Sequence, residues 1–202
     1  MVPPADHWDR GRVVRWVSDM MDVYAAPAAF TEAECLRILD QIASAPTRDA
    51  KLVGQAQHHN VRRADLVWLD EVEGCEWVTE RAIDLVRVAN REMFDFDITD
   101  FSESPQVARY DSSREGHFDW HSDIGDGRLA ARRKLTIVIQ LDAGVGYQGG
   151  DLQIMPSNHT VTAARGRGDA VMFPSFMLHR VTPVTKGTRH SLTLWCHGPS
   201  FR

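Results

Sequence analysis

In the first half of the chain, hydrophobic positions recur at the three- and four-residue spacing of amphipathic helices. One such segment begins at 31–34, where Thr-Glu-Ala-Glu forms a capping-box pattern, and it continues until Pro46. A second segment runs from about residue 77 to residue 93 with the same spacing. Between them, residues 64–69 have the composition of a strand, and residues 94–98 alternate with period two, which is typical of a strand. We therefore expect a helical first half that contains a few strands.

After residue 100 the pattern changes to short strand-like runs that are separated by glycine and proline. The candidate strands are 106–110, 116–121, 135–141, 151–155, 160–163, 170–173, 179–184 and 191–196. A jelly roll or small barrel suits this many short strands, because two sheets folded together leave few free edges. We expect an α+β, mainly β fold, a double-stranded β-helix (jelly roll) with N-terminal helices packed against it. It would form a single domain over 1–202, with a helical half at 1–100 and the jelly-roll core at 101–202.

Composition restricts the class of protein without naming an activity. The 202 residues are 43% hydrophobic and 25% charged, with a formal net charge of −5, which is typical of a folded globular protein. No apolar run approaches the ~20 residues of a membrane helix, and residues 1–12 contain no apolar signal segment. The three cysteines are far apart, which does not suggest a disulfide framework. We expect a cytoplasmic protein that binds neither membranes nor nucleic acid, and the oligomeric state stays open.

Histidine and aspartate supply the first candidate for chemistry. Two His-x-Asp pairs follow one another, His117 with Asp119 and His121 with Asp123. On a strand, residues two apart point to the same face about 6.6 Å apart, so either pair could offer an imidazole and a carboxylate to one metal ion. Such a pair also arises by chance in a chain rich in both residues, and alternation places both pairs on one face. Periodicity alone cannot choose between them.

More distant residues strengthen the case for a metal site. His179 enters one predicted strand, and Arg189 lies two residues before the start of the next. By alternation Arg189 and Ser191 share a face opposite to the apolar positions. An arginine inside a barrel needs a partner, because a buried unpaired guanidinium is costly. A ligand carboxylate could be that partner, with the serine hydroxyl nearby. Two histidines and one carboxylate are also the ligand set of non-haem Fe(II) oxygenases, which leaves coordination positions open.

Five motifs in order resemble those of a known family. They are 106–110 (Gln-Val-Ala-Arg-Tyr), His121-x-Asp123, 133–136 (Arg-Lys-Leu-Thr), 149–152 (Gly-Gly-Asp-Leu), and the run from His179 through Val181, Pro183, Val184 and Gly187 to Arg189 and Ser191. Together they resemble the prolyl 4-hydroxylase-like branch of the Fe(II)- and 2-oxoglutarate-dependent oxygenases. The sequence is especially similar to the bacterial PKHD-type hydroxylases. The resemblance covers roughly residues 100–197.

The resemblance implies specific roles, residue by residue. It implies that His121, Asp123 and His179 bind iron and that Arg189 binds the distal carboxylate of 2-oxoglutarate. It also implies that Tyr110, Ser191 and Leu152 line the pocket of this cosubstrate. Here His117 and Asp119 fall outside the family's register. One departure concerns the strand 135–141, where relatives often have a tyrosine and this chain has Gln140 or a neighbour.

The implied activity is hydroxylation of an unactivated C–H, with Fe(II), 2-oxoglutarate and O₂. The expected substrate is a prolyl or other amino-acid residue in a peptide or protein, which a wide groove past the iron would favour. The alternative is a free amino acid or small metabolite, which a closed pocket under the N-terminal helices would favour. A non-catalytic jelly-roll module that binds metal for structure is an alternative from another class. The N-terminal half and the loop 124–133, which contains glycines and three arginines, are expected to form the substrate entrance. The strand around residues 62–69 is the next candidate for it.

Overall fold

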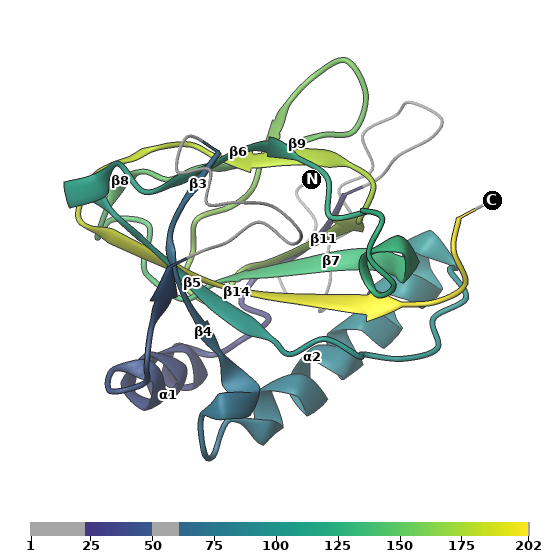
Figure 1. Ribbon diagram of the computed structural model, residues 1–202, viewed down its shortest axis with the longest axis horizontal. Helices are drawn as coiled ribbons and strands as arrows, with labels where there is room; N and C mark the ends of the chain where they lie inside the picture. The colour runs from purple at the N-terminus through teal and green to yellow at the C-terminus, as the bar shows by residue number, and fades with distance from the viewer. Residues whose placement is uncertain (1–22, 50–60, 202) are drawn as a thin grey trace, which may run out of the picture.

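The fold has three layers, in which a small sheet, a large sheet and a pair of helices are stacked in that order (Figure 1). The computed structural model describes residues 23–49 and 61–201; residues 1–12, where no signal segment is expected, lie outside this part of the chain. The two sheets face each other as in a jelly roll, and the predicted fold class is confirmed. No helix within 23–49 and 61–201 is both long and apolar enough to span a membrane.

The large sheet has seven strands in the order β1-β11-β7-β14-β5-β4-β2. Its strands are β1 (Tyr24–Ala26), β11 (Ala170–Pro174), β7 (Arg133–Gln140), β14 (Thr188–His197), β5 (Gln106–Asp111), β4 (Asp65–Trp68) and β2 (Arg48–Asp49). All neighbouring strands in it are antiparallel. Three strands come from the first half of the chain, so that half contributes to the sheets as well as to the helices.

The small sheet has five strands in the order β10-β9-β12-β6-β3. These are β10 (Val161–Thr162), β9 (Leu152–Met155), β12 (Leu178–Val181), β6 (His117–His121) and β3 (Arg62–Arg63), and a separate pair joins β13 (Val184–Lys186) to β8 (Gln148–Gly149). Within this sheet, His179 on β12 lies opposite His121 on β6. The pairing therefore brings the two histidines of the predicted metal site together.

Both helices lie against the outer face of the large sheet (Figure 1). Helix α1 (Glu32–Ile42) begins with the predicted capping box, in which Thr31 and Glu34 bond to each other's backbone N–H groups. Helix α2 (Glu76–Ala89) continues into a π-helical turn, η2 (Asn90–Phe94). Three short 3₁₀ turns complete the elements: η1 (Leu69–Glu71), η3 (Ser112–Arg114) and η4 (Ala130–Arg132).

The strand expected at 94–98 is wrong. The segment leaves the helix through Asp95, which has a left-handed backbone (φ 52°). Asn90 then holds the chain with two hydrogen bonds to the backbone of Phe96. Phe94 and Phe96 stack on each other with their ring centroids 5.9 Å apart and pack against the helix-side core. The period-two alternation thus reflects apolar side chains on an irregular segment and no strand pairing.

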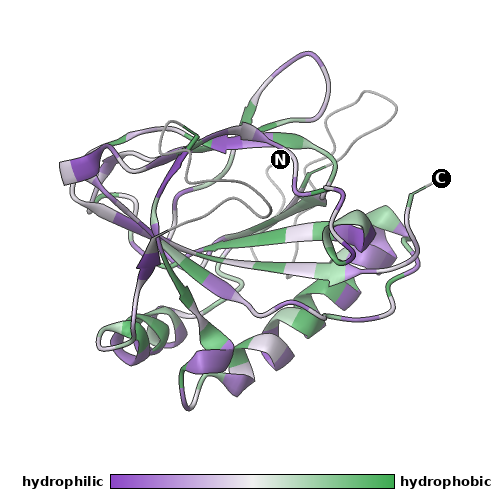
Figure 2. Cartoon of the chain, in the orientation of Figure 1, coloured by the Kyte–Doolittle hydropathy of each residue, from purple (hydrophilic) through white to green (hydrophobic). Residues whose placement is uncertain are grey.

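The hydrophobic residues form two cores, one on each face of the large sheet (Figure 2). The outer core lies between this sheet and the helices and includes Leu192, Leu194 and Cys196 of β14. The inner core lies between the two sheets. Alternation along β14 therefore turns Arg189 and Ser191 towards the space between the sheets, as the sequence pattern predicts.

Candidate metal centre and cosubstrate pocket

A cavity of about 640 Å³ lies between the two sheets. Its lining includes one group of metal-ligand type, formed by His121, Asp123 and His179, whose candidate ligand atoms all lie within 4.8 Å of one another. The cavity also contains Arg189, Ser191, Tyr110 and Leu152. The structure thus brings all seven predicted site residues into one cavity.

The two histidines are held with the same nitrogen facing the centre of the group. Nδ1 of His121 lies 2.7 Å from the carbonyl oxygen of Asp119, and Nδ1 of His179 lies 3.0 Å from that of Met177. A carbonyl only accepts hydrogen bonds, so each Nδ1 carries a proton and each Nε2 is the nitrogen directed towards Asp123. Such a backbone bond commonly orients a metal-binding imidazole.

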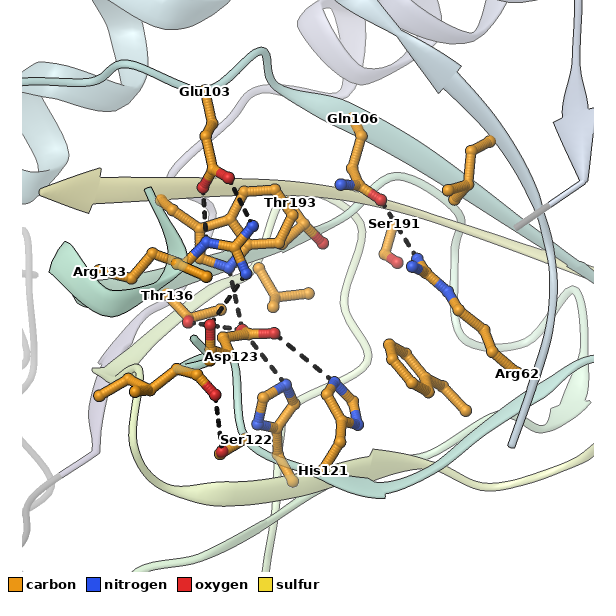
Figure 3. A pocket seen from close by; sticks show the side chains of 18 of the residues that line it. Arg62, Glu103, Gln106, His121, Ser122, Asp123, Arg133, Thr136, Ser191 and Thr193 are labelled. Atoms are coloured by element: carbon orange, nitrogen blue, oxygen red, sulfur yellow. Dashed lines mark hydrogen bonds and ion pairs between the residues drawn. The ribbon is translucent and has the colours of Figure 1, made fainter. Parts of the chain in front are cut away.

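The carboxylate of Asp123 faces both imidazoles (Figure 3). Its Oδ1 is 3.7 Å from Nε2 of His121, and its Oδ2 is 3.5 Å from Nε2 of His179. The hydroxyl of Thr136 donates to Oδ2 at 2.7 Å, and the indole Nε1 of Trp195 donates to it at 3.0 Å. These two donors orient the carboxylate and leave Oδ1 directed towards His121.

The protonation states of His121 and Asp123 favour binding of a cation. Burial, reinforced by the neighbouring His179, lowers the pKa of His121 to about 3. Burial alone would raise the pKa of Asp123, but the two imidazoles and Arg133 outweigh it and lower that pKa to about 2. At neutral pH the imidazole of His121 is therefore neutral and the carboxylate is ionised, which are the forms that bind metals.

The first His-x-Asp pair does not join this group, because β6 carries a bulge. The step from His179 to Val181 on β12 is matched on β6 by the longer step from His121 to Phe118. The extra residue puts Phe118 and His121 on the same side, where their rings stack with centroids 3.4 Å apart. The expectation that both pairs share one face is therefore wrong. Asp119 contributes through its backbone carbonyl to His121, and its side chain is exposed.

Arg189 is the most deeply buried charged side chain of the cavity, with 1% of its surface exposed. Its Nε and Nη2 donate to Oε1 of Gln140, at 3.2 and 2.9 Å, and its Nη1 donates to the hydroxyl of Ser191 at 3.3 Å. Its guanidinium also lies 5.4 Å from the ring centroid of Tyr110. Among the residues that the structure describes, no carboxylate lies within ion-pair distance of Arg189. A buried cation held only by neutral groups is suited to an anionic ligand.

Gln140 explains the departure from the family pattern. It lies on β7 opposite Ser191 of β14, so its amide oxygen reaches the guanidinium of Arg189. Leu152 lines the same cavity from β9 and is buried in the inner core. The wall on which relatives often carry a tyrosine is here built around an arginine held by an amide.

Two of the three arginines in the loop 124–133 are not ordinary surface residues. Arg133 is buried and forms a bidentate ion pair with Glu103, at 2.5 and 2.7 Å. It also donates to the carbonyl of Asp123 at 2.9 Å and covers the ring of Trp195 at 4.0 Å. Arg132 bonds to Asp100 and to the carbonyl of Gly198, while Arg128 is exposed. Residues 124–127, 129 and 130 nevertheless line the cavity, where the entrance is expected.

Comparison with known proteins identifies this arrangement. Residues 105–197 match the sequence model of the 2OG-Fe(II) oxygenase superfamily. The resemblance to these oxygenases is confirmed. Among relatives of the superfamily, the PKHD-type hydroxylase IL0759 of Idiomarina loihiensis is 33% identical over 103 residues, which cover 48% of this chain and 47% of that protein. The PKHD-type hydroxylase PiuC of Pseudomonas aeruginosa is 32% identical over 85 residues, 40% of this chain and 38% of that protein. The matched stretches thus span less than half of each relative.

Solved structures of prolyl hydroxylases share the fold. The prolyl-4-hydroxylase of Pseudomonas putida superposes with a TM-score of 0.68 at 20% identity, covering 87% of this chain and 91% of that one. A Trichoplax adhaerens prolyl hydroxylase, solved with a hypoxia inducible factor peptide fragment, superposes with a TM-score of 0.67 at 20% identity, covering 82% and 77%. At about 20% identity, these similarities show a shared fold.

The superfamily implies Fe(II), 2-oxoglutarate and O₂, and the cavity fits the first two. Two imidazole nitrogens and a carboxylate oxygen converge as Fe(II) ligands do. The guanidinium of Arg189 is buried and has no acidic partner among the described residues. It is therefore available to bind one carboxylate of a dicarboxylate such as 2-oxoglutarate.

Several cavity residues could not be predicted from the sequence. Thr136 and Trp195 contact Asp123 only because β7 and β14 are paired, with these two residues directly opposite each other. The bulge that turns Phe118 inward leaves no mark in the hydrophobic pattern. A further residue, Arg62 of β3, also reaches the cavity (Figure 3). Its neighbour on the chain is another arginine, so the residue type alone gave no signal.

Proposed function

We propose that this protein is an Fe(II)- and 2-oxoglutarate-dependent dioxygenase that hydroxylates an unactivated C–H. His121, Asp123 and His179 would hold the iron, and Arg189 would hold the distal carboxylate of 2-oxoglutarate, with Ser191, Tyr110 and Leu152 around it. The overall reaction converts substrate C–H, 2-oxoglutarate and O₂ into substrate C–OH, succinate and CO₂. The bound metal supplies the oxidising chemistry, and the chain's residues supply position and environment.

One observation carries the proposal: a buried arginine without an acidic partner in the described chain shares a cavity with a His-Asp-His group. A metal group alone would also suit a structural site. A buried arginine alone would suit many ligands. Both in one cavity suit a ligand with a carboxylate at its far end and metal-binding oxygens at the other, which describes 2-oxoglutarate.

The chain's own residues perform three tasks in this proposal. The carbonyl groups of Asp119 and Met177 keep the imidazoles oriented with Nε2 towards the metal. Thr136 and Trp195 fix the carboxylate of Asp123, so little reorganisation is needed when the metal binds. The apolar surfaces of Leu152, Val181 and Phe118 surround the site and limit access of water.

For the substrate we propose a prolyl or other amino-acid residue within a peptide or protein. Support comes from the helices, which pack on the outer face of the large sheet and do not cover the cavity. The closed pocket under the helices, which would favour a free metabolite, is therefore not formed by them. The hydroxylase relatives and the peptide complex of the Trichoplax adhaerens neighbour point the same way.

The alternative of a structural metal site has less support. Structural sites usually offer four protein ligands, whereas the group in the described part of the chain has three. Three ligands leave positions for a cosubstrate. The buried arginine would also have no purpose in a purely structural site.

The test is formation of succinate from 2-oxoglutarate by the full chain, with Fe(II), O₂ and a panel of proline-containing peptides. We expect succinate formation that depends on Fe(II) and a product that is 16 Da heavier. His121→Ala and His179→Ala should each abolish both signals and weaken Fe(II) binding, because each removes an imidazole ligand. His117→Ala is the matched control, a histidine on the same strand outside the metal group, and it should retain activity.

Loss of activity in His117→Ala together with retention in His121→Ala would show that the proposed register is wrong by four residues. Absence of Fe(II) binding by the folded wild-type protein would overturn the proposed function altogether. Fe(II) binding without any succinate, with or without peptides, would instead favour a metal-binding module.

A further inference from the structure

Among the residues that the structure describes, three arginines line the cavity: Arg62, Arg133 and Arg189. Arg133 is neutralised by Glu103 through two hydrogen bonds. Under the proposed function, Arg189 is matched by the distal carboxylate of 2-oxoglutarate. Arg62 is left as a positive charge without such a match.

The hydrogen-bond and ring partners of Arg62 within the described ranges are neutral. Its Nη2 donates to the amide oxygen of Gln106 at 3.2 Å, as the right side of Figure 3 shows, and its Nε is buried without a hydrogen-bond partner. Within the described ranges, no carboxylate lies close enough to Arg62 to form an ion pair. A guanidinium with an unused, buried donor is incompletely satisfied, and such groups favour an anionic acceptor.

The position of Arg62 is set by two stacked rings. Its guanidinium carbon lies 4.4 Å from the ring centroid of Phe118, and that ring stacks on the imidazole of His121. Strand pairing fixes this arrangement, since Arg62 on β3 is directly opposite Phe118 on β6. Only one aromatic ring therefore separates the guanidinium from a proposed iron ligand.

Arg62 and Arg189 come from different sheets. Arg62 enters from β3 of the small sheet, whereas Arg189 enters from β14 of the large sheet. Each has its own neutral acceptor, Gln106 for Arg62 and Gln140 for Arg189. The two guanidinium groups are thus held separately, which suits two anions better than one.

We infer that Arg62 binds a carboxylate of the substrate, so that the substrate of this enzyme is anionic close to the carbon that is hydroxylated. The inference rests on the proposed function and deepens it by naming the substrate class. Gln106 assists by holding Nη2, which leaves the other Nη group of the planar fork for the carboxylate. Trp68 and residues 124–127 also line the cavity.

Such a carboxylate could come from two sources. It could be the α-carboxylate of a free or C-terminal amino acid, or the side chain of an aspartate or glutamate beside the target residue in a peptide. Both present the same planar acceptor to Arg62. The test therefore includes one set of probes for each source.

The first step loads the full chain with Fe(II) and 2-oxoglutarate without O₂ and records the visible metal-to-ligand absorption band. Probes are then added in matched pairs and their binding is measured by the change in this band. One set contains the N-acetyl amino acids and their amides. The other contains blocked peptides with proline followed by glutamate or by glutamine. If no band forms at all, the proposed function fails before Arg62 is tested.

We expect at least one acid to bind about ten- to a hundredfold more tightly than its neutral partner, the range for a charge-assisted hydrogen bond. Arg62→Gln should abolish this preference, and Arg62→Lys should restore part of it. The affinity for 2-oxoglutarate should stay the same in both variants. Arg87→Gln, which changes an exposed arginine on α2, is the matched control and should keep the preference.

The set that shows the preference identifies the source of the carboxylate. If every acid binds no better than its neutral partner in the wild type, the inference is overturned. It is also overturned if the preference persists in Arg62→Gln. A weaker 2-oxoglutarate band in Arg62→Gln would show that Arg62 serves the cosubstrate instead.

Discussion

At the scale of single residues, the cavity relies on groups that hold other groups in place. Gln140 holds Arg189, Thr136 and Trp195 hold Asp123, and a backbone carbonyl holds each imidazole. None of these supporting groups is charged. Each can therefore orient a charged partner without neutralising it, and the charge stays available to a ligand.

The first residue-scale prediction concerns Arg189. Arg189→Ala should raise the half-saturating concentration of 2-oxoglutarate by about ten- to a hundredfold, because a charge-assisted bond of ~1.5–3 kcal/mol is lost. Arg189→Lys should recover only part of the affinity, since an ammonium cannot form the planar fork. Titration of the anaerobic Fe(II) protein by its visible absorption band measures this. Unchanged affinity in Arg189→Ala would exclude the proposed role.

A second prediction separates the effect of a charge at position 140 from the effect of side-chain shape there. In Gln140→Glu the new carboxylate has nearly the same size but would form an ion pair with Arg189, in competition with the cosubstrate. We expect at least about a tenfold loss of 2-oxoglutarate affinity in this variant. Gln140→Ala should lose less, because it removes support without adding a competitor. The same absorption titration distinguishes them, and equal affinities for Gln140→Glu and wild type would contradict the prediction.

At the scale of elements, the site depends on how strands are aligned. Asp111 ends β5, next to Tyr110, and accepts hydrogen bonds from the backbone N–H of Ser113 and from the hydroxyl of Thr188. Thr188 directly precedes Arg189 on β14. One carboxylate therefore fixes the relative position of the strands that carry Tyr110 and Arg189.

This alignment should depend on pH. Hydrogen bonds from Ser113 and Thr188, with help from Arg109, hold the pKa of Asp111 well below its ordinary 3.8. A lowered pKa means that the unfolded chain binds the proton first, so the stabilisation is complete above about pH 4 and is lost as the pH falls through and below that value. We expect Asp111→Asn to lower stability at pH 6 and to show a smaller further loss at pH 3. Urea unfolding at both pH values measures this, with exposed Asp84→Asn as the control; identical pH dependence in Asp111→Asn and wild type would refute it.

Sequence patterns predicted where the strands and helices lie better than they predicted how neighbouring strands are aligned. The strands after residue 100 were predictable because period two and Gly/Pro boundaries mark them, and the face of β14 followed from its alternation. Strands of two or three residues, such as β2 and β3, carry too few positions for any period. The bulge in β6 arises from pairing with β12, so the true orientation of His117 and Phe118 could not be derived from β6 alone. The role of Gln140 could not be derived from the sequence, because only strand pairing places its side chain beside Arg189.

At the scale of the whole molecule, the large sheet separates two cores with different tasks. The helix-side core contains buried apolar side chains from α1 and α2, and the inner core surrounds the cavity. The helices therefore stabilise the sheet from the face opposite to the proposed chemistry. Changes in the outer core should alter stability without altering the affinity of the folded protein for its ligands.

Ile38 of α1 tests this separation. It is fully buried in the outer core, so Ile38→Ala should lower the free energy of unfolding by about 2–5 kcal/mol. In the folded protein, the affinities for Fe(II) and 2-oxoglutarate should remain those of the wild type. Leu36→Ala, on the exposed side of the same helix, is the control and should cost much less. Weaker 2-oxoglutarate binding by folded Ile38→Ala would show that the two cores are coupled.

The bond between Trp195 and Asp123 has an optical consequence. The indole is buried, donates from Nε1 to the carboxylate at 3.0 Å, and is covered by the guanidinium of Arg133. An indole's fluorescence responds to the electric field around it, and a paramagnetic ion held by the neighbouring Asp123 would quench it. Addition of Fe(II) should therefore dim part of the emission of this six-tryptophan chain, and Trp195→Phe should remove most of that response. Trp195 thus serves as an intrinsic fluorophore beside the proposed iron site, and metal occupancy of that site can be followed in real time without a label.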